Sequence, residues 1–266
     1  MTYHTWILPT LDVEENFEVQ DVIEPMKERW LYTIPVSLVY FTAVHLGQKY
    51  METKTPWNLR MPLVIWSGLL ALFSWIGTIR TTVFLITSIQ EDGILPTVCG
   101  IRDKLDNPCW FWLYLFAMSK LPELGDTFFI VVRKSKLHFL HWYHHITVFI
   151  YSFYIIAHPQ SGMIWYAGMN FAVHALMYTY YTLRAARVNI PRKCAMFVTI
   201  CQLSQMVVGV GLQLTSSYML YQGYDCDTSV QDIVFGMCIY ASYMVLFADF
   251  FNKTYLVGKS EKVKTR

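Results

Sequence analysis

Charged residues are scarce in this chain. Asp, Glu, Lys and Arg make up 15% of its 266 residues, whereas a soluble domain typically carries about 25%. The formal net charge is only +2, so the composition does not suggest a nucleic-acid-binding protein. Hydrophobic residues make up 55% of the chain, and apolar stretches recur that approach or exceed the roughly 20 residues needed to cross a bilayer. We therefore predict an all-α, polytopic membrane protein.

The N-terminal region lacks the features of a secretory signal peptide. Residues 1–29 contain seven acidic side chains and no apolar core followed by a small-residue cleavage site. We expect three regions along the chain: an acidic, partly ordered lumenal arm over residues 1–29, a membrane domain over residues 30–256, and a cytosolic basic tail over residues 257–266.

Seven segments are apolar enough to cross a membrane. Backbone polar groups must be satisfied within lipid, so each segment is expected to be a helix. The predicted spans cover residues 30–47, 62–86, 110–132, 139–157, 163–183, 194–220 and 233–256. The third and fourth spans have the weakest hydropathy because they contain several polar residues.

The distribution of Lys and Arg predicts the orientation. With seven spans, fifteen of the 21 basic residues lie on the side of the C-terminus and four on the side of the N-terminus. Because basic loops stay in the cytosol, we expect a cytosolic C-terminus and a lumenal N-terminus. Lys262 and Lys264 resemble a retrieval signal of the endoplasmic reticulum. A basic tail that touches anionic lipid explains them equally well.

The six cysteines form no CxxC motif, so a zinc or redox motif is not supported. Cys99, Cys109 and Cys226 fall in lumenal loops, where disulfides persist, and a Cys99–Cys226 bond could tie the second loop to the sixth. Cys194, Cys201 and Cys238 lie in or beside spans and are expected to be small buried residues.

The third span contains a cluster of charged residues, which are costly in a bilayer and are therefore candidates for function. Lys120, Glu123 and Thr127 share one helical face, with Asp126 beside it. Pro122 and Gly125 should bend the helix at this point. The cluster is compatible with an internal Lys–Glu ion pair or with the wall of a cavity.

The next three spans each present a polar face. The fourth carries four histidines within eight residues, a density that a hydrogen-bonded core histidine does not explain; imidazole can act as base, nucleophile or metal ligand. These candidate residues are His138, His141, His144 and His145 on the fourth span, Asn170, His174, Tyr178 and Tyr181 on the fifth, and Thr199, Gln202 and Gln205 on the sixth. An aromatic belt would account for the tyrosines, and interhelical hydrogen bonds for the glutamines. Together the faces predict a polar chamber near the cytosolic surface.

Membrane desaturases also carry HxxHH boxes, around a di-iron centre. Here there is a single HxxHH. The five histidines of the cluster, with Lys120 adjacent, make a poor set of ligands for a hard cation. We expect no metal cofactor, while a mononuclear site stays open.

At these residues the chain resembles the ELO family of very-long-chain fatty acid elongases. The boxes occur in the family's order: KxxExxDT at residues 120–127, HxxHH at 141–145, HxxMYxYY at 174–181 and TxxQxxQ at 199–205. With Trp142 inside it, the second box resembles that of the family branch that extends saturated and monounsaturated acyl chains.

The resemblance implies a seven-helix protein of the endoplasmic reticulum membrane in which the last six helices surround a narrow tunnel. It also implies a 3-oxoacyl-CoA synthase, which condenses a long-chain acyl-CoA with malonyl-CoA to give 3-ketoacyl-CoA, carbon dioxide and CoA. Association with the enzymes of the later steps is then expected, and a homo-oligomer is compatible with the sequence.

Our hypothesis is that His144 attacks the thioester to form an acyl-imidazole, with His141 and His145 managing protons. Asn170 and His174 would stabilise the enolate. Direct attack on the bound thioester, with His144 as a base, is the alternative. The expected substrate-binding residues are Lys120, Glu123, Asp126, Tyr178, Tyr181, Gln202, Gln205, Arg133, Lys136 and Arg187. For the basic ones, a role in topology alone is equally plausible.

Two other classes share part of this pattern. A seven-helix receptor would have the same number of spans, and a transporter would also line its path with polar faces. Neither class needs four histidines on one helix. Release of carbon dioxide from malonyl-CoA would separate an enzyme from both.

Overall fold

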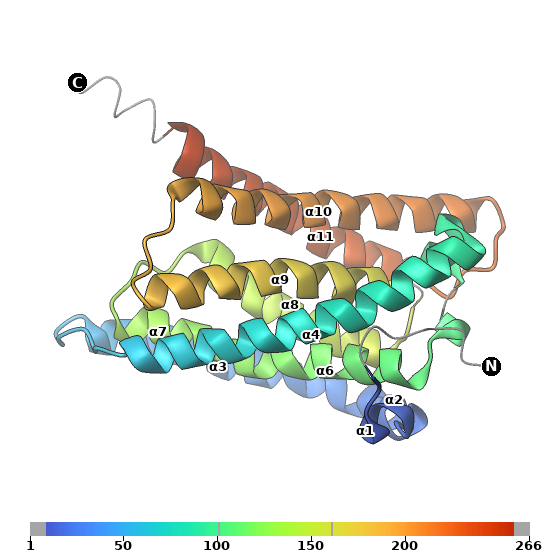
Figure 1. Ribbon diagram of the computed structural model, residues 1–266, viewed down its shortest axis with the longest axis horizontal. Coiled ribbons are helices and arrows are strands. Elements are labelled where there is room, and N and C mark those ends of the chain that lie inside the picture. The colour runs from blue at the N-terminus through green and yellow to red at the C-terminus, as the bar shows by residue number, and fades with distance from the viewer. Residues whose placement is uncertain (1–8, 101, 161, 258–266) are drawn as a thin grey trace.

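The computed structural model describes residues 9–100, 102–160 and 162–257. Regular structure within these residues is entirely helical, as predicted (Figure 1). The basic tail with Lys262 and Lys264, apart from Val257, and the first eight residues of the arm lie outside the described residues.

Each predicted span coincides with a helix, and the third is divided in two. These helices are α3 (Thr33–Met51), α4 (Arg60–Asp92), α6 (Asn107–Glu123), α7 (Gly125–Val132), α8 (Phe139–Ala157), α9 (Met163–Ala185), α10 (Arg192–Tyr221) and α11 (Val230–Phe251). The shorter elements are α1 (Asp12–Glu15), α2 (Gln20–Arg29), α5 (Ile94–Cys99), the 3₁₀ turns Trp30–Tyr32 and Arg102–Lys104, and a π-helical turn Asn252–Val257.

Four of the described helical segments have the length and hydropathy to cross a membrane: Gln20–Met51, Arg60–Asp92, Arg192–Tyr221 and Val230–Val257. The chain is therefore a multi-pass membrane protein. The polar helices α6 to α9 fall outside this criterion, so the number of seven spans stays a prediction.

The predicted bend in the third span occurs between α6 and α7. Helix α6 ends at Glu123, one residue after Pro122, and α7 begins at Gly125. A Cβ at Gly125 would lie 2.9 Å from the indole of Trp66 on α4, so glycine allows α4 to approach here. The interruption of the helix thus coincides with the point where Trp66 of α4 packs against Gly125.

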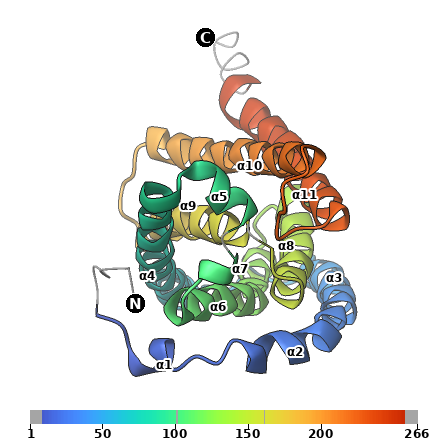
Figure 2. The same ribbon diagram turned by 90° about the vertical axis from the view of Figure 1, so that its right-hand side faces the viewer.

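Viewed end-on, α4, α6, α8, α11 and α10 follow one another around the molecule (Figure 2). Helix α9 packs on α4 and α10 within this outline, whereas α3 lies outside it against α7 and α8. Most polar candidate residues therefore lie on helices that face the interior of the bundle.

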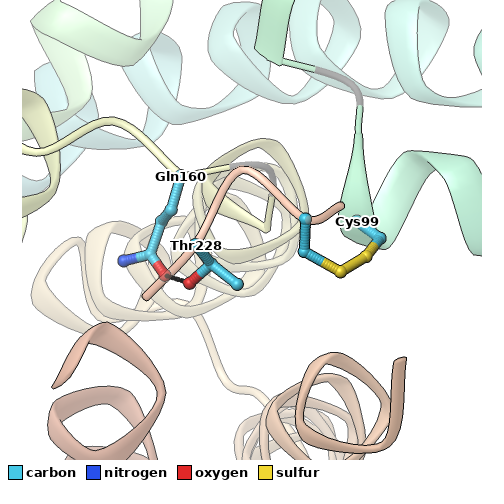
Figure 3. The surroundings of a disulfide bond; sticks show 4 residues. Cys99, Gln160 and Thr228 are labelled. Carbon is cyan, nitrogen blue, oxygen red and sulfur yellow. Dashed lines mark hydrogen bonds between the residues drawn. A yellow bond between two sulfur atoms is a disulfide. The ribbon is translucent and has the colours of Figure 1, made fainter. Parts of the chain in front are cut away.

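A disulfide joins two loops at one end of the bundle. Cys99, the last residue of α5, is bonded to Cys226 in the connection between α10 and α11 (Figure 3). Close by, the hydroxyl of Thr228 donates a hydrogen bond of 3.3 Å to Gln160 in the α8–α9 connection. Three helix connections are thus linked at this end. Cys194 and Cys238 are exposed, contrary to the prediction of burial, because they lie on the outer faces of α10 and α11.

The N-terminal arm is anchored by one buried carboxylate, Glu14. Arg80 on α4 donates hydrogen bonds of 3.1 and 2.8 Å to its two oxygens, and the indole of Trp112 on α6 donates one of 2.6 Å. Arg80 also donates to the carbonyl of Pro9 at 2.7 Å. The arm therefore binds across α4 and α6.

We predict that Glu14→Gln destabilises the protein. Removing one partner of a buried ion pair leaves the other charge uncompensated, at a cost of about 3 kcal/mol or more. The matched control is Glu18→Gln, which removes the same charge from an exposed position. Thermal unfolding in detergent should give a clearly lower melting temperature for Glu14→Gln only. Equal melting temperatures would contradict the anchoring role.

Candidate active site

The polar faces predicted from the sequence converge on a cavity of about 430 Å³. Its walls come from α4, α7, α8, α9, α10, α11 and the connection between α7 and α8. Thirteen of the predicted candidate residues line it: Asp126, Arg133, Lys136, His138, His141, His144, His145, Asn170, His174, Tyr178, Tyr181, Gln202 and Gln205.

His144 lies at the inner end of this cavity. It also lines a second cavity of about 30 Å³, together with apolar and aromatic side chains that include Phe116, Ile155 and Ile239. Its ring meets Tyr243 of α11 edge-on at a centroid distance of 4.7 Å. His144, Asn170, Gln205 and Met206 line both cavities, so His144 lies where the two cavities adjoin.

The other histidines of α8 surround His144. The rings of His141 and His145, one helical turn apart, have centroids 4.4 Å apart, and His145 is 5.8 Å from His144. The Nδ1 atoms of His144 and His145 are buried and have no hydrogen-bond partner among the described residues. Polar atoms of this kind are expected where a substrate supplies the missing partner.

Lys120 and Glu123 form the ion pair that the sequence left open. The Lys120 ammonium donates hydrogen bonds of 2.8 and 3.1 Å to the two oxygens of Glu123, and both side chains are buried. Neither residue is among the described residues that line the cavity. Their predicted contact with substrate is thus not seen in this geometry, which favours an indirect role.

The ion pair acts on the cavity through two residues of α9. Lys120 donates a 3.0 Å hydrogen bond to Oδ1 of Asn170. Because this bond occupies the amide oxygen, the NH₂ group of Asn170 remains as a donor. Nδ1 of His174 lies 3.7 Å from the Glu123 carboxylate, so the carboxylate is close to this ring but beyond direct hydrogen-bond distance.

Asp126 binds two neighbouring helices. It accepts 2.6 Å hydrogen bonds from the indole of Trp66 on α4 and from the hydroxyl of Tyr178 on α9. Both carboxylate oxygens are thus used within the protein, which suits a structural brace of the cavity wall. On α10, Gln202 donates to the sulfur of Met177 at 3.3 Å.

Basic residues gather at the mouth of the cavity. Arg133 and Lys136 line it as predicted for the α7–α8 connection, and Arg184 lines it from the last turn of α9. Arg187, the predicted partner, is not among the described lining residues. It follows the end of α9 at Ala185 and has a left-handed backbone, with φ of 66°. Arg184 is thus added to the basic candidates.

Several cavity residues were not predicted from the sequence. Ser67 comes from α4, Ser135 from the α7–α8 connection, and Phe247 and Phe250 from α11. The sequence holds no local signal for them, since each meets the cavity only through the packing of distant helices. Among the described residues, no set of three or more His, Cys, Asp or Glu is arranged to hold a metal ion.

We predict strong coupling between Lys120 and Glu123 in stability. Lys120→Met or Glu123→Leu alone leaves a buried charge unpaired, at about 3–5 kcal/mol, whereas the double substitution removes both charges. The melting temperature in detergent should therefore be higher for the double variant than for either single variant. Additive losses in a double-mutant cycle would contradict the coupling.

Comparison with known proteins identifies relatives over nearly the whole chain. The model of the ELO family, described as the GNS1/SUR4 family, matches residues 25–263. Very long chain fatty acid elongase 6 of Gallus gallus is 41% identical over 97% of this chain and 96% of its own length. The human proteins named elongase 6 and elongase 3 are 39% and 38% identical, over 96% and 94% of this chain and 96% and 93% of theirs. The chain therefore belongs to the ELO family.

Proposed function

We propose that this protein is a fatty acid elongase. In this proposal it condenses a long-chain acyl-CoA with malonyl-CoA to 3-ketoacyl-CoA, with release of carbon dioxide and CoA. Family membership and the names of the relatives support the general activity. The observation that carries the chemistry is the position of His144 between a large cavity lined by histidines and basic residues and a small cavity lined mainly by apolar and aromatic side chains.

An acyl-CoA thioester needs such a junction. Its CoA part carries phosphates, which suit the basic mouth of Arg133, Lys136 and Arg184. Its acyl tail is apolar and suits the side chains around the smaller cavity beyond His144, a space of about 30 Å³ that would have to widen to admit the tail. The thioester carbonyl then lies beside the His144 imidazole.

In the first step a neutral imidazole nitrogen of His144 attacks the thioester carbon. The C–S bond breaks, CoA leaves as a thiolate, and the imidazole proton passes to that thiolate by way of the neighbouring histidines. The product is an acyl-imidazole. Covalent catalysis of this kind divides one difficult condensation into two easier steps.

In the second step malonyl-CoA loses its carboxylate as carbon dioxide. The enolate attacks the acyl carbon, the C–N bond to His144 breaks, and the imidazole regains a proton that comes ultimately from solvent. The NH₂ group of Asn170, oriented by Lys120, donates to the enolate oxygen. His174 lines the same cavity and would accept a proton during this step.

The alternative for the chemistry is a ternary complex. In that case His144 acts as a base and the enolate attacks the bound thioester directly. Both routes use the chain's own residues, and we propose that neither a metal nor another cofactor takes part.

The proposed topology has seven spans, with the last six around the substrate tunnel, and places the protein in the membrane of the endoplasmic reticulum. The mouth with Arg133 and Lys136 would face the cytosol. The disulfide between Cys99 and Cys226 is at the opposite end, and a lumenal position would preserve it. Enzymes of the later elongation steps would be its partners.

Carbon dioxide release tests the proposed activity. Purified protein with palmitoyl-CoA and carboxyl-labelled malonyl-CoA should release labelled carbon dioxide and form the 3-ketoacyl-CoA. His144→Ala should lower this rate at least 100-fold, since it removes the proposed nucleophile or base. The control His158→Ala alters an exposed histidine at the other end of α8 and should keep the rate. Equal loss in both variants, or no product from folded wild-type protein, would contradict the proposal.

The far end of the small cavity predicts a limit on acyl length. Tyr240 lines this cavity, and its ring lies against Gly209, where a Cβ would approach to 2.2 Å. Tyr240→Ala should therefore shift the preferred substrates to longer chains. Gly209→Ala should push the ring inward and shift them to shorter chains.

Gly211→Ala is the matched control for these variants, because nothing in the described structure lies within 4 Å of a Cβ at that position. Competition among acyl-CoAs of different length, followed by mass spectrometry of the products, measures the preference. The same length profile in Tyr240→Ala and Gly209→Ala as in Gly211→Ala would contradict the assignment.

A further inference from the structure

Helix α3 lies outside the bundle and yet reaches the histidines. The hydroxyl of Tyr40 on α3 is 2.5 Å from the hydroxyl of Thr127 on α7. The Thr127 hydroxyl is in turn 3.0 Å from Nε2 of His141 on α8. These contacts form a continuous chain of hydrogen bonds from the first long helix to a histidine of the candidate site.

The series of hydrogen bonds from Tyr40 to His141 has a preferred direction. A phenol is a strong donor and a weaker acceptor, so the Tyr40 hydroxyl donates to Thr127. The Thr127 hydroxyl then donates its own proton to Nε2 of His141. In the reverse direction, the Tyr40 proton would have no acceptor among its described hydrogen bonds. The order Tyr40 to Thr127 to His141 therefore uses every donor.

The apolar surroundings hold Tyr40 in place independently of its hydroxyl. Its ring packs against the cluster of Val44, Met51 and Val131, and a Cβ at Gly47 would lie 3.3 Å from Val131. Helices α3 and α7 are thus in close contact at this level. A phenylalanine fits the same position, so the hydroxyl can be removed without disturbing the packing.

We propose that Tyr40 is a positioning residue for the candidate site. Through Thr127 it fixes His141 as the tautomer that accepts at Nε2 and carries its proton on Nδ1. In the resting enzyme the opposite edge of the ring then presents an N–H donor to the reaction chamber. The assignment of the His141 tautomer depends only on the hydrogen bonds. The expected effect on turnover depends also on the proposed elongase function.

The direct test is the tautomer of His141. In protein labelled with ¹⁵N-histidine, the His141 signal, identified by its loss in His141→Gln, should show a protonated Nδ1. Tyr40→Phe should produce a mixture of tautomers, because the Thr127 hydroxyl is then free to reverse. The control Tyr50→Phe removes a hydroxyl from an exposed tyrosine of the same helix and should leave the signal unchanged. An unchanged tautomer in Tyr40→Phe would overturn the proposal.

Turnover gives a second readout. Tyr40→Phe should lower kcat for condensation about 3- to 10-fold with little change in KM, which is the effect of one neutral hydrogen bond. Thr127→Val should lower kcat by at least as much, whereas Thr127→Ser, which keeps the hydroxyl, should retain the wild-type kcat. The double variant Tyr40→Phe/Thr127→Val should have the same kcat as Thr127→Val. A tautomer change without any loss in kcat would overturn the role in turnover. Absence of condensation in the wild type would instead contradict the elongase function and leave the NMR test valid.

Discussion

The site depends on one charge, the ammonium of Lys120, buried in an apolar bundle. An unpaired charge in such a place costs several kcal/mol, so the structure must supply acceptors. Glu123 on the same helix supplies two, and Asn170 on α9 supplies the third. Ser119 completes the set by donating to Glu123 at 2.9 Å. Satisfying this charge fixes α6 against α9 and thereby aims Asn170 and His174 at the cavity.

The break after Glu123 extends this order to the surrounding helices. Because the chain resumes as a new helix at Gly125, the next two residues point to different neighbours. Asp126 binds Trp66 and Tyr178, which joins α4, α7 and α9. Thr127 contacts Tyr40 and His141, which joins α3, α7 and α8. A motif of eight residues thus connects most of the bundle to the histidines, and few of its members need to touch substrate.

Local patterns in the sequence predicted the elements and their polar faces well. The bounds of α8 agree with the prediction at both ends, and the histidines, Asn170 and the glutamines share one cavity as their helical spacing implied. The assignment of Arg187 to substrate binding stays a prediction: Arg187 follows the end of α9, has a left-handed backbone and is not among the described residues that line the cavity, which spacing along a helix does not reveal.

Contacts between distant helices could not be predicted in the same way. The acidic arm was expected to be partly ordered, but the pairing of Glu14 with Arg80 spans 66 residues and has no local pattern. The same holds for Tyr40, which reaches Thr127 across 87 residues. The spacing of Lys120 and Glu123 predicted an ion pair as one of two alternatives. It did not predict that the pair is buried and bonded to Asn170, which is how the pair orients that side chain.

The central claim of this account is that His144 carries the acyl group. The most direct measurement is the intact mass of purified protein after incubation with a long-chain acyl-CoA alone. The account predicts a mass increase of one acyl group, release of free CoA, loss of the adduct when malonyl-CoA is added, and no adduct in His144→Ala. Condensation by wild-type protein without any adduct would contradict the covalent step and favour direct attack on the bound thioester.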